Sequence, residues 1–299
     1  MTVPWHRTTF QESQRLNCRR LAFALLFALI GCLLSLFFIP YLTPQIARAK
    51  PGQTFLGFDR NDYPGDSRLA GLRKVFSFTG YWLNVPPGAK NDTWIGKRTI
   101  LREARFGFVV LFNGRADAEL RKSADPGATG RADAEAAVEA ARHEGFPANT
   151  VIFLDQEEGG RMLPEQNSYI YAWVDGVSGS GYRAGIYCSG IAAPGDGNVV
   201  TAADIRANAG ARGIVYWVAN DQCPPSQGCG RFNNPPTPAE SGVRFADVWQ
   251  YAQSPRRTSS AQACRNYAAD GNCYAPGWEG EKVFVDLNAA GSEDPSSGR

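Results

Sequence analysis

The 299-residue chain has only two histidines, His6 and His143. This scarcity leaves almost no room for a histidine-ligated metal site, or for catalysis by a Ser-His-Asp or Cys-His arrangement. The net charge is only +2, so the chain lacks the strong basic bias typical of nucleic-acid-binding proteins. There is no internal repeat, and no glycine-rich phosphate loop follows the first predicted strand. We therefore predict no nucleic-acid partner, no metal and no cofactor.

The chain does have one long apolar run near its N-terminus, residues 21–39. At about 1.5 Å per residue, a helix of this length approaches the ~30 Å hydrocarbon thickness of a bilayer. A buried core helix is the alternative, but such helices are rarely apolar on every face. The basic residues before the run are Arg7, Arg15, Arg19 and Arg20. By the positive-inside rule, they keep residues 1–20 in the cytoplasm.

We therefore predict a transmembrane or signal segment over 21–42, a linker over 43–53 and an extracytoplasmic domain. Two fates of the segment remain open. Ala47-Arg48-Ala49 has the small-x-small form of a signal-peptidase site. The apolar run exceeds the usual signal length of about 7–15 residues, which favours an uncleaved single-helix anchor. Secretion after cleavage near Ala49 is the alternative.

Cysteine usage agrees with export. Cys223 and Cys229 flank one short turn, and Cys264 and Cys273 flank another. The spacing predicts two local disulfides in an oxidising compartment. Zinc is the competing interpretation, but these spacings are wider than those of usual zinc knuckles, and no histidine is near. The remaining cysteine of the domain, Cys188, is predicted to be buried in a strand.

From residue 54 the chain alternates short apolar or aromatic runs with helical patterns. The predicted strands are 54–59, 75–83, 106–113, 150–157, 182–189, 213–220, 245–252 and 283–288. The predicted helices are 93–104, 131–144, 165–181 and 202–209. Several strands are apolar almost throughout, as parallel strands buried on both faces should be.

This alternation predicts an α/β fold, a (β/α)8 TIM-type barrel of regular or irregular form over residues 54–290. An open doubly wound sheet is the alternative. Residues 221–244 are rich in proline, glycine and asparagine and predict a long loop, and a second irregular insertion runs over 253–280. The polar residues 291–299 predict a disordered tail.

Carboxylates stand where a parallel barrel places its active residues, at the ends of predicted strands. The candidates are Asp59, Asp155, Glu157 and Asp286. Asp155 and Glu157 lie two apart on an extended segment, so both side chains face the same way, with Cα atoms roughly 6.5–7 Å apart. Their mutual repulsion favours a proton on one of them. A protonated acid beside an ionised carboxylate is what glycosidic cleavage needs. The alternative is that they are solvated loop residues or helix caps.

Aromatic residues near the same strand ends are candidates for contact with sugar rings. The predicted substrate-binding residues are Tyr81, Trp82, Tyr187, Trp217, Trp249 and Gln250. Aromatic faces suit the C–H faces of sugars. The alternative for each of them is core packing, because aromatic side chains dominate core burial.

The order of several short motifs resembles a known family. These motifs are Gly57-Phe58-Asp59, Phe153–Glu157, Gly181–Ser189, Trp249-Gln250-Tyr251 and Val285–Asn288. Together they resemble the glycoside hydrolase family 25 lysozyme superfamily, and more closely its DUF1906 branch, the glycoside hydrolase-like domain of exported bacterial proteins. The segment 60–64 departs from the lysozyme form, whereas 79–83 matches the DUF1906 branch better.

The resemblance implies roles for the four acids. Glu157 would be the general acid, and Asp155 would orient or activate the substrate's acetamido group, which attacks the anomeric carbon. Asp59 and Asp286 would complete the acidic cluster. The implied substrate is an N-acetylated glycan such as peptidoglycan. Our leading hypothesis is an exported glycosidase acting on cell-envelope polysaccharide. A barrel that binds glycan without cleaving it is the alternative, and a metal-dependent hydrolase is a third hypothesis with no histidines to support it.

Overall fold

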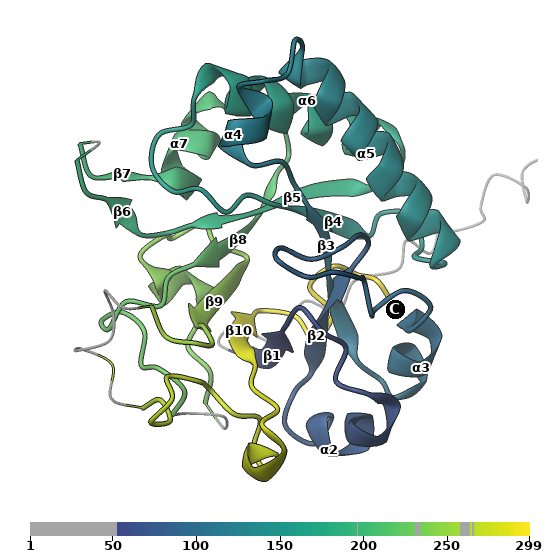
Figure 1. Ribbon diagram of the computed structural model, residues 1–299, viewed down its shortest axis with the longest axis vertical. Helices are drawn as coiled ribbons and strands as arrows, with labels where there is room; N and C mark the ends of the chain where they lie inside the picture. Colours follow the sequence, from purple (N-terminus) through teal and green to yellow (C-terminus); the bar gives the residue numbers. More distant parts are fainter. Residues whose placement is uncertain (1–52, 196, 231–233, 258–263, 265) are drawn as a thin grey trace, which may run out of the picture. The chain divides into compact units, whose positions relative to one another are not determined.

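The computed structural model describes residues 53–299, except residues 196, 231–233, 258–263 and 265 (Figure 1). The predicted membrane or signal segment over 21–42 lies outside these residues, as does the cytoplasmic stretch before it. Within the described part of the chain, no helix is long and apolar enough to cross a membrane.

Eight strands of the described region close into a barrel, in the order β1-β10-β9-β8-β5-β4-β3-β2. They are β1 (Phe55–Asp59), β2 (Phe78–Trp82), β3 (Gly107–Asn113), β4 (Val151–Asp155), β5 (Arg183–Ser189), β8 (Val215–Ala219), β9 (Val248–Ala252) and β10 (Asp286–Ala290). Each overlaps one of the predicted runs, although β10 begins three residues after the start of its run and ends two residues beyond it. The barrel is therefore confirmed against the open sheet. A small antiparallel pair, β6 (Ala192–Ala193) and β7 (Val199–Val200), lies outside it.

The last strand departs from the regular pattern. β10 runs antiparallel to both of its neighbours, β1 and β9, whereas the other barrel pairs are parallel. The register places Asp286, the first residue of β10, opposite Asp59, the last residue of β1. The sequence predicts Asp286 at the end of a parallel strand. It begins an antiparallel one instead, because the chain after β9 returns to β10 from the same rim without crossing the barrel.

Helices follow strands β1 to β5 along the chain and lie at the top and the lower right of Figure 1. They are α2 (Leu69–Leu72), α3 (Arg98–Glu103), α4 (Asp117–Leu120), α5 (Pro126–His143), α6 (Pro164–Gly179) and α7 (Thr201–Asn208). The four predicted helices correspond to α3, α5, α6 and α7. Helix α5 begins where the Asp125 side chain accepts a hydrogen bond from the backbone N–H of Ala128, with Pro126 in the first turn.

Helices α5 and α6 pack tightly because glycines stand at their crossing. A Cβ on Gly130 would lie 2.3 Å from the carbonyl oxygen of Tyr169, and one on Gly176 would lie 2.7 Å from Ala134. The apolar face of α6 is buried at a spacing of three to four residues and includes Tyr169, Trp173 and Val177. These contacts hold β4 and β5 against a rigid helical layer.

The connections after β8 and β9 contain no α-helix among their described residues. Short 3-10 turns occur at Pro238–Ser241 and Glu279–Glu281 instead. We call residues 220–247 the first insertion and residues 253–285 the second. Both leave the barrel from the rim where the parallel strands end, since β8 and β9 are neighbouring parallel strands.

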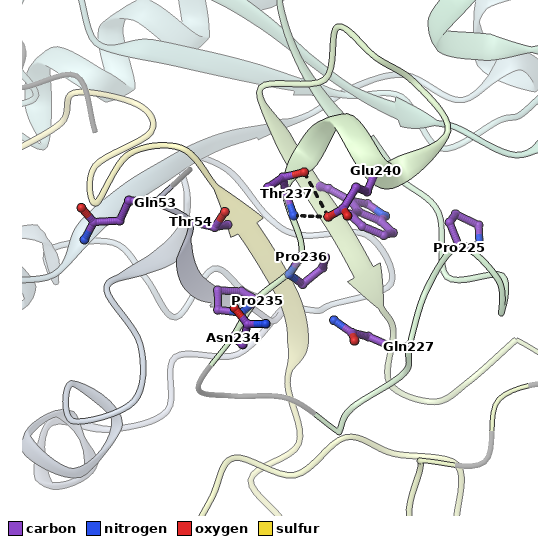
Figure 2. A pocket seen from close by; sticks show the side chains of 10 residues that line it. Gln53, Thr54, Pro225, Gln227, Asn234, Pro235, Pro236, Thr237 and Glu240 are labelled. Carbon is purple, nitrogen blue, oxygen red and sulfur yellow. Dashed lines mark hydrogen bonds between the residues drawn. The ribbon is translucent and has the colours of Figure 1, made fainter. Parts of the chain in front are cut away.

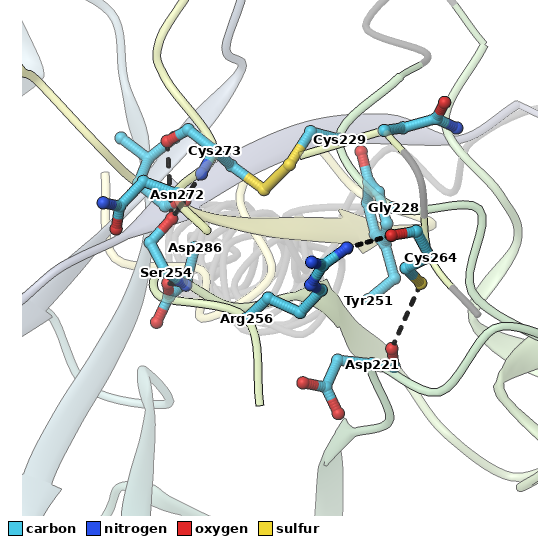
Figure 3. Close-up of a disulfide and its surroundings, with 12 residues drawn as sticks. Asp221, Gly228, Cys229, Tyr251, Ser254, Arg256, Cys264, Asn272, Cys273 and Asp286 are labelled. Carbon is cyan, nitrogen blue, oxygen red and sulfur yellow. Dashed lines mark hydrogen bonds between the residues drawn. A yellow bond between two sulfur atoms is a disulfide. The ribbon is translucent and has the colours of Figure 1, made fainter. Parts of the chain in front are cut away.

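The two disulfides join these insertions to each other. Cys223 pairs with Cys264, with a Cα–Cα distance of 5.3 Å. Cys229 pairs with Cys273, with a Cα–Cα distance of 5.5 Å (Figure 3). The predicted local pairs, Cys223–Cys229 and Cys264–Cys273, are therefore wrong. The physical reason is that neighbouring strands bring the two insertions face to face at one rim. Cys188 is free and buried, as predicted.

The prediction of a disordered tail over 291–299 is also wrong. The backbone N–H of Ser296 donates to the carbonyl of Phe108, and its hydroxyl accepts from the N–H of Val110. The Arg98 guanidinium donates to the carbonyl of Gly298 at 2.7 Å. The composition indicated disorder, but these polar groups satisfy backbone groups at the start of β3 that would otherwise lack partners.

Candidate active site

The acid pair lies where β4 ends. Asp155 is the last residue of this strand and is buried, whereas Glu157 is exposed. Neither carboxyl oxygen of Asp155 accepts a hydrogen bond from an amide, hydroxyl or guanidinium of the described residues, but its carboxyl group and that of Glu157 share a hydrogen bond. Desolvation, followed by the charge of Glu157, raises the pKa of Asp155 well above its ordinary value. Desolvation also raises the pKa of Glu157, while the positive charge of Arg257 opposes this shift. The pair therefore tends to keep a proton.

Asp59 is held by two amides across the barrel. Its Oδ1 accepts a hydrogen bond from Gln250 Nε2 at 3.0 Å and from Asn288 Nδ2 at 2.6 Å. Desolvation nevertheless raises the pKa of Asp59 to about 6, because it outweighs these two bonds, and the charge of Glu157 adds to it. Asp59 thus titrates close to physiological pH.

Asp286 belongs to the same group of acids, although it lies on the antiparallel strand β10. Its Oδ1 accepts from the backbone N–H of Ser254. Burial and the charge of Asp59 raise the pKa of Asp286 well above its ordinary value, and Glu157 adds to the effect. The four acids predicted from the sequence therefore lie at one rim. The charge of Glu157 raises the pKa values of the other three, and the charge of Asp59 raises those of Asp155 and Asp286.

Two of the predicted aromatic residues support this acid group from inside the barrel. The hydroxyl of Tyr187 donates to Gln250 Oε1 at 2.8 Å, and the indole N–H of Trp217 donates to Asn288 Oδ1 at 2.9 Å. Their rings meet edge to face with centroids 5.0 Å apart. Trp217 lies on β8 but reaches Asn288 on β10, which is not its neighbour, so its side chain points into the barrel. Gln250 likewise points inward.

Tyr81 and Trp249 point to the outside of the barrel wall, so their assignment to the acid rim is wrong. Tyr81 is fully buried among Trp94, Phe108 and Phe146, and its hydroxyl binds Glu144. The reason is the alternation of side chains along a strand: because Gln250 points inward, Trp249 must point outward.

Trp249 is fully buried, and its indole N–H donates to the carbonyl of Asn220 at 2.9 Å. It contributes to a separate pocket of about 700 Å³, which Pro225, Thr237 and Glu240 also line (Figure 2). Trp82 is buried, and its indole N–H donates to the carbonyl of Arg60, one residue after Asp59. A role for Trp82 in sugar contact stays a prediction.

Several polar residues of the site did not stand out in the sequence. Asn288 lies two residues after Asp286 in the quoted motif, and Gln253 directly follows β9, so both positions carried a weak signal. Arg257 and Asp221 belong to the insertions, where no periodicity marks them. Asp221 is 1% exposed, and its Oδ1 lies 3.6 Å from Arg257 Nε.

Glu158 stands beside the acid pair but has a structural role. Its Oε1 accepts from the backbone N–H of Asp117 at 2.7 Å, at the start of α4. Its Oε2 accepts from Gln156 Nε2 at 2.6 Å. Glu158 therefore ties α4 to the end of β4. Among the described residues, no group of three or more His, Cys, Asp or Glu side chains is placed to hold a metal ion.

Comparison with known proteins places this acid group in a family context. Residues 101–203 match the family model described as the Rv2525c-like, glycoside hydrolase-like domain. The predicted resemblance is confirmed. This glycoside hydrolase-like segment runs from α3 to α7 and includes Asp155 and Glu157. No curated protein matches the chain.

Three solved structures illustrate the proteins that the chain is similar to. An uncharacterized B. stearothermophilus protein is 20% identical, with 78% of this chain and 94% of that chain covered and a TM-score of 0.49. The Mycobacterium tuberculosis Tat-secreted protein Rv2525c is 13% identical, with 79% and 94% covered and a TM-score of 0.45. A bacterial lysozyme from Streptomyces coelicolor is 15% identical, with 78% and 90% covered and a TM-score of 0.41.

Proposed function

We propose that this protein is an exported glycosidase that hydrolyses cell-envelope polysaccharide, such as peptidoglycan, by acid-assisted cleavage. The observation that supports the proposal is the group of four carboxyls at one rim, all with raised pKa values. Crowded, desolvated acids cost stability, and such perturbed groups gather at functional sites. The glycoside hydrolase-like segment contains two of them.

In the proposed reaction, Glu157 donates its proton to the glycosidic oxygen, because it is the most exposed member of the acid pair. As the bond between that oxygen and the anomeric carbon breaks, the carbonyl oxygen of the substrate's acetamido group bonds to the carbon. Asp155, whose oxygens accept from no amide, hydroxyl or guanidinium of the described residues, accepts from the acetamido N–H and orients it. Water then attacks the anomeric carbon, the bond between that carbon and the acetamido oxygen breaks, and a proton of the water returns to Glu157.

The test is the release of reducing ends from purified peptidoglycan. We expect Glu157→Gln to lower the rate by about 10²–10⁴-fold, the range typical of a lost general acid. The matched control is Glu139→Gln, an exposed glutamate on α5 that should leave the rate unchanged. Thermal unfolding of both variants checks that the domain stays folded. Absence of reducing ends with the wild-type protein, on peptidoglycan and on other N-acetylated glycans, would exclude the enzyme proposal.

A glycan-binding barrel without catalysis is the second candidate. The observation that favours it is Arg257, whose charge opposes the rise in the pKa of Glu157 and so reduces the fraction of Glu157 that carries a proton. The amides of Gln250 and Asn288 are also groups that bind without reacting. This candidate predicts that wild type and Glu157→Gln sediment equally with cell-wall preparations and that neither releases sugar.

Export remains part of the proposal. The two disulfides are typical of an oxidising compartment. We propose that residues 21–42 anchor the domain outside the cytoplasm, with cleavage near Ala49 as the alternative. The N-terminal sequence of the protein recovered from cells decides between them, because cleavage would leave Lys50 as the first residue.

A further inference from the structure

A chain of hydrogen bonds links the second insertion to Asp59. Arg257 Nε donates to Gln253 Oε1 at 2.7 Å. Gln253 Nε2 donates to Gln250 Oε1 at 2.8 Å. Gln250 Nε2 then donates to Asp59 Oδ1 at 3.0 Å. The chain therefore starts at a guanidinium, passes through two amides and ends at a carboxyl.

Both ends of this series of hydrogen bonds require the same orientation of the Gln253 and Gln250 side-chain amides. A guanidinium has only donors, so the Gln253 atom that faces Arg257 must be the carbonyl oxygen, which leaves the Gln253 NH₂ to face Gln250. An ionised carboxylate has only acceptors, so Gln250 must present its NH₂ to Asp59. Turning either amide around would place two donors or two acceptors against each other inside the barrel.

Tyr187 fits this direction and reinforces it. Its hydroxyl donates to Gln250 Oε1 at 2.8 Å and accepts from Gln253 Nε2 at 3.2 Å. The single hydroxyl proton is thus directed to Gln250, which makes the carbonyl of that amide accept twice and leaves its NH₂ for Asp59. Chains of this kind polarise one another, so each bond strengthens the next.

Arg257 is itself anchored by the first insertion. Asp221 Oδ1 lies 3.6 Å from Arg257 Nε, and no side chain of the described residues donates a hydrogen bond to either Asp221 oxygen. Burial raises the pKa of Asp221, and the charge of Arg257 opposes this rise. The charge of this almost fully buried carboxylate therefore depends on the guanidinium. The disulfide Cys223–Cys264 joins the segment that carries Asp221 to the second insertion, and Figure 3 shows Asp221 beside Cys264.

We propose that Arg257 is a positioning residue of the acid site, which directs the amides of Gln253 and Gln250 toward Asp59 and is held in place by the buried Asp221. Only its effect on turnover rests on the proposed function; the hydrogen-bond direction does not. The other acids that face Asp59 are Asp155, Glu157 and Asp286, and the variants below leave all three in place. Arg257 also lies close enough to Glu157 to lower the pKa of that carboxyl.

The test is a ¹³C NMR titration of the side-chain carboxyls in wild type and in Arg257→Gln. The variant loses the charge that directs the chain, so we expect the pKa of Asp59 to rise above its value of about 6. The pKa of Glu157 should rise as well, each by roughly one unit. Arg257→Lys should restore the Glu157 titration more fully than that of Asp59, because it keeps the charge but not the geometry. Arg244→Gln, at an exposed arginine of the first insertion, is the matched control.

A second variant distinguishes the effect of the hydrogen bonds from the effect of the Arg257 charge. It also provides a test if Arg257→Gln does not fold. Gln253→Leu leaves Arg257 and Asp221 paired but interrupts the chain. We expect it to raise the pKa of Asp59 and to leave that of Glu157 nearly unchanged. An Asp59 titration identical to wild type in folded Gln253→Leu, or in folded Arg257→Gln, overturns the positioning role.

Turnover provides a readout that a merely structural residue would not change. If the protein cleaves glycan, Arg257→Gln should move the alkaline limb of the pH–rate profile to higher pH, because Glu157 then keeps its proton longer. A profile that keeps its shape and only loses amplitude contradicts the positioning role. A wild-type protein without turnover excludes the proposed function alone, since the NMR titration decides the role of Arg257 independently.

Discussion

The barrel has two unlike sides. From β3 to β5 the strands alternate with helices, and α5 and α6 pack closely at glycines. From β8 to β10, two insertions joined by disulfides take the place of helices. The helix-backed side contributes the acid pair Asp155 and Glu157, whereas the cross-linked side contributes Gln250, Asn288 and Arg257. Under the proposed function, the reacting acids thus lie at the end of β4, and the groups that orient the site come from β9, β10 and the cross-linked second insertion.

The family match falls on the helix-backed side, at residues 101–203. The cross-linked side lies outside it, although this side contributes Asp286 on β10, and β1, which contributes Asp59, lies outside it as well. The predictions below test whether the two sides differ in what holds them together and in what they contribute to the site.

The largest expected effect concerns the cross-links. Replacing both Cys223 and Cys264 with alanine removes a link across 41 residues of sequence separation. Because Cys229–Cys273 still joins the two segments, the loop that this bond closes in the unfolded chain is only about 15 residues long, and loop-closure entropy predicts a loss of about 3 kcal/mol in the free energy of unfolding. Urea unfolding with and without reductant measures it: reductant should destabilise wild type more than the variant. If the variant is as stable as wild type, the insertions are held by their packing rather than by the disulfide.

An effect no larger than this is expected from Asp59→Asn. The folded-state pKa of Asp59 is raised from 3.8 to about 6, so its protonated form is favoured by folding, and stability is lost as pH rises through 6. Asparagine stays neutral and should make the protein more stable above pH 7, by up to about 3 kcal/mol. Below pH 4 the difference should vanish. Thermal unfolding at pH 4 and pH 8 measures the change, and a pH-independent difference would contradict the raised pKa.

The smallest effect is expected from Glu158→Ala, on the helix-backed side. The variant removes the acceptor for the backbone N–H of Asp117 and the partner of the buried Gln156. We expect a loss of about 1 kcal/mol in stability, as for a lost helix cap, with glycan turnover unchanged. Calorimetry and the reducing-end assay measure the two quantities. A loss of turnover comparable to that of Glu157→Gln would show that Glu158 belongs to the acid site.

The acid group could be predicted because the positions of its members follow from the local sequence pattern of each strand. Each run of apolar residues indicates a strand, and Asp59, Asp155 and Glu157 stand at strand ends, where a parallel barrel gathers its polar residues. Asp286 was predicted at the right rim with the wrong strand direction, since nothing in residues 283–288 shows which way the strand runs.

The inward or outward direction of Tyr81 could not be predicted, because β2 is buried on both faces and shows no polar alternation. The contributions of Arg257 and Asp221 were also hidden, since their partners lie far away in sequence. Their effect depends on two loops meeting at one rim.

The sequence by itself determined the eight strands, the main helices and the four acids, because periodicity and strand ends are local properties. Only the tertiary structure decided the antiparallel β10, the crossed disulfides, the ordered tail and the amide chain to Asp59. Each of these features depends on which distant segments of the chain meet at the same end of the barrel, and the closure of the barrel determines which segments meet.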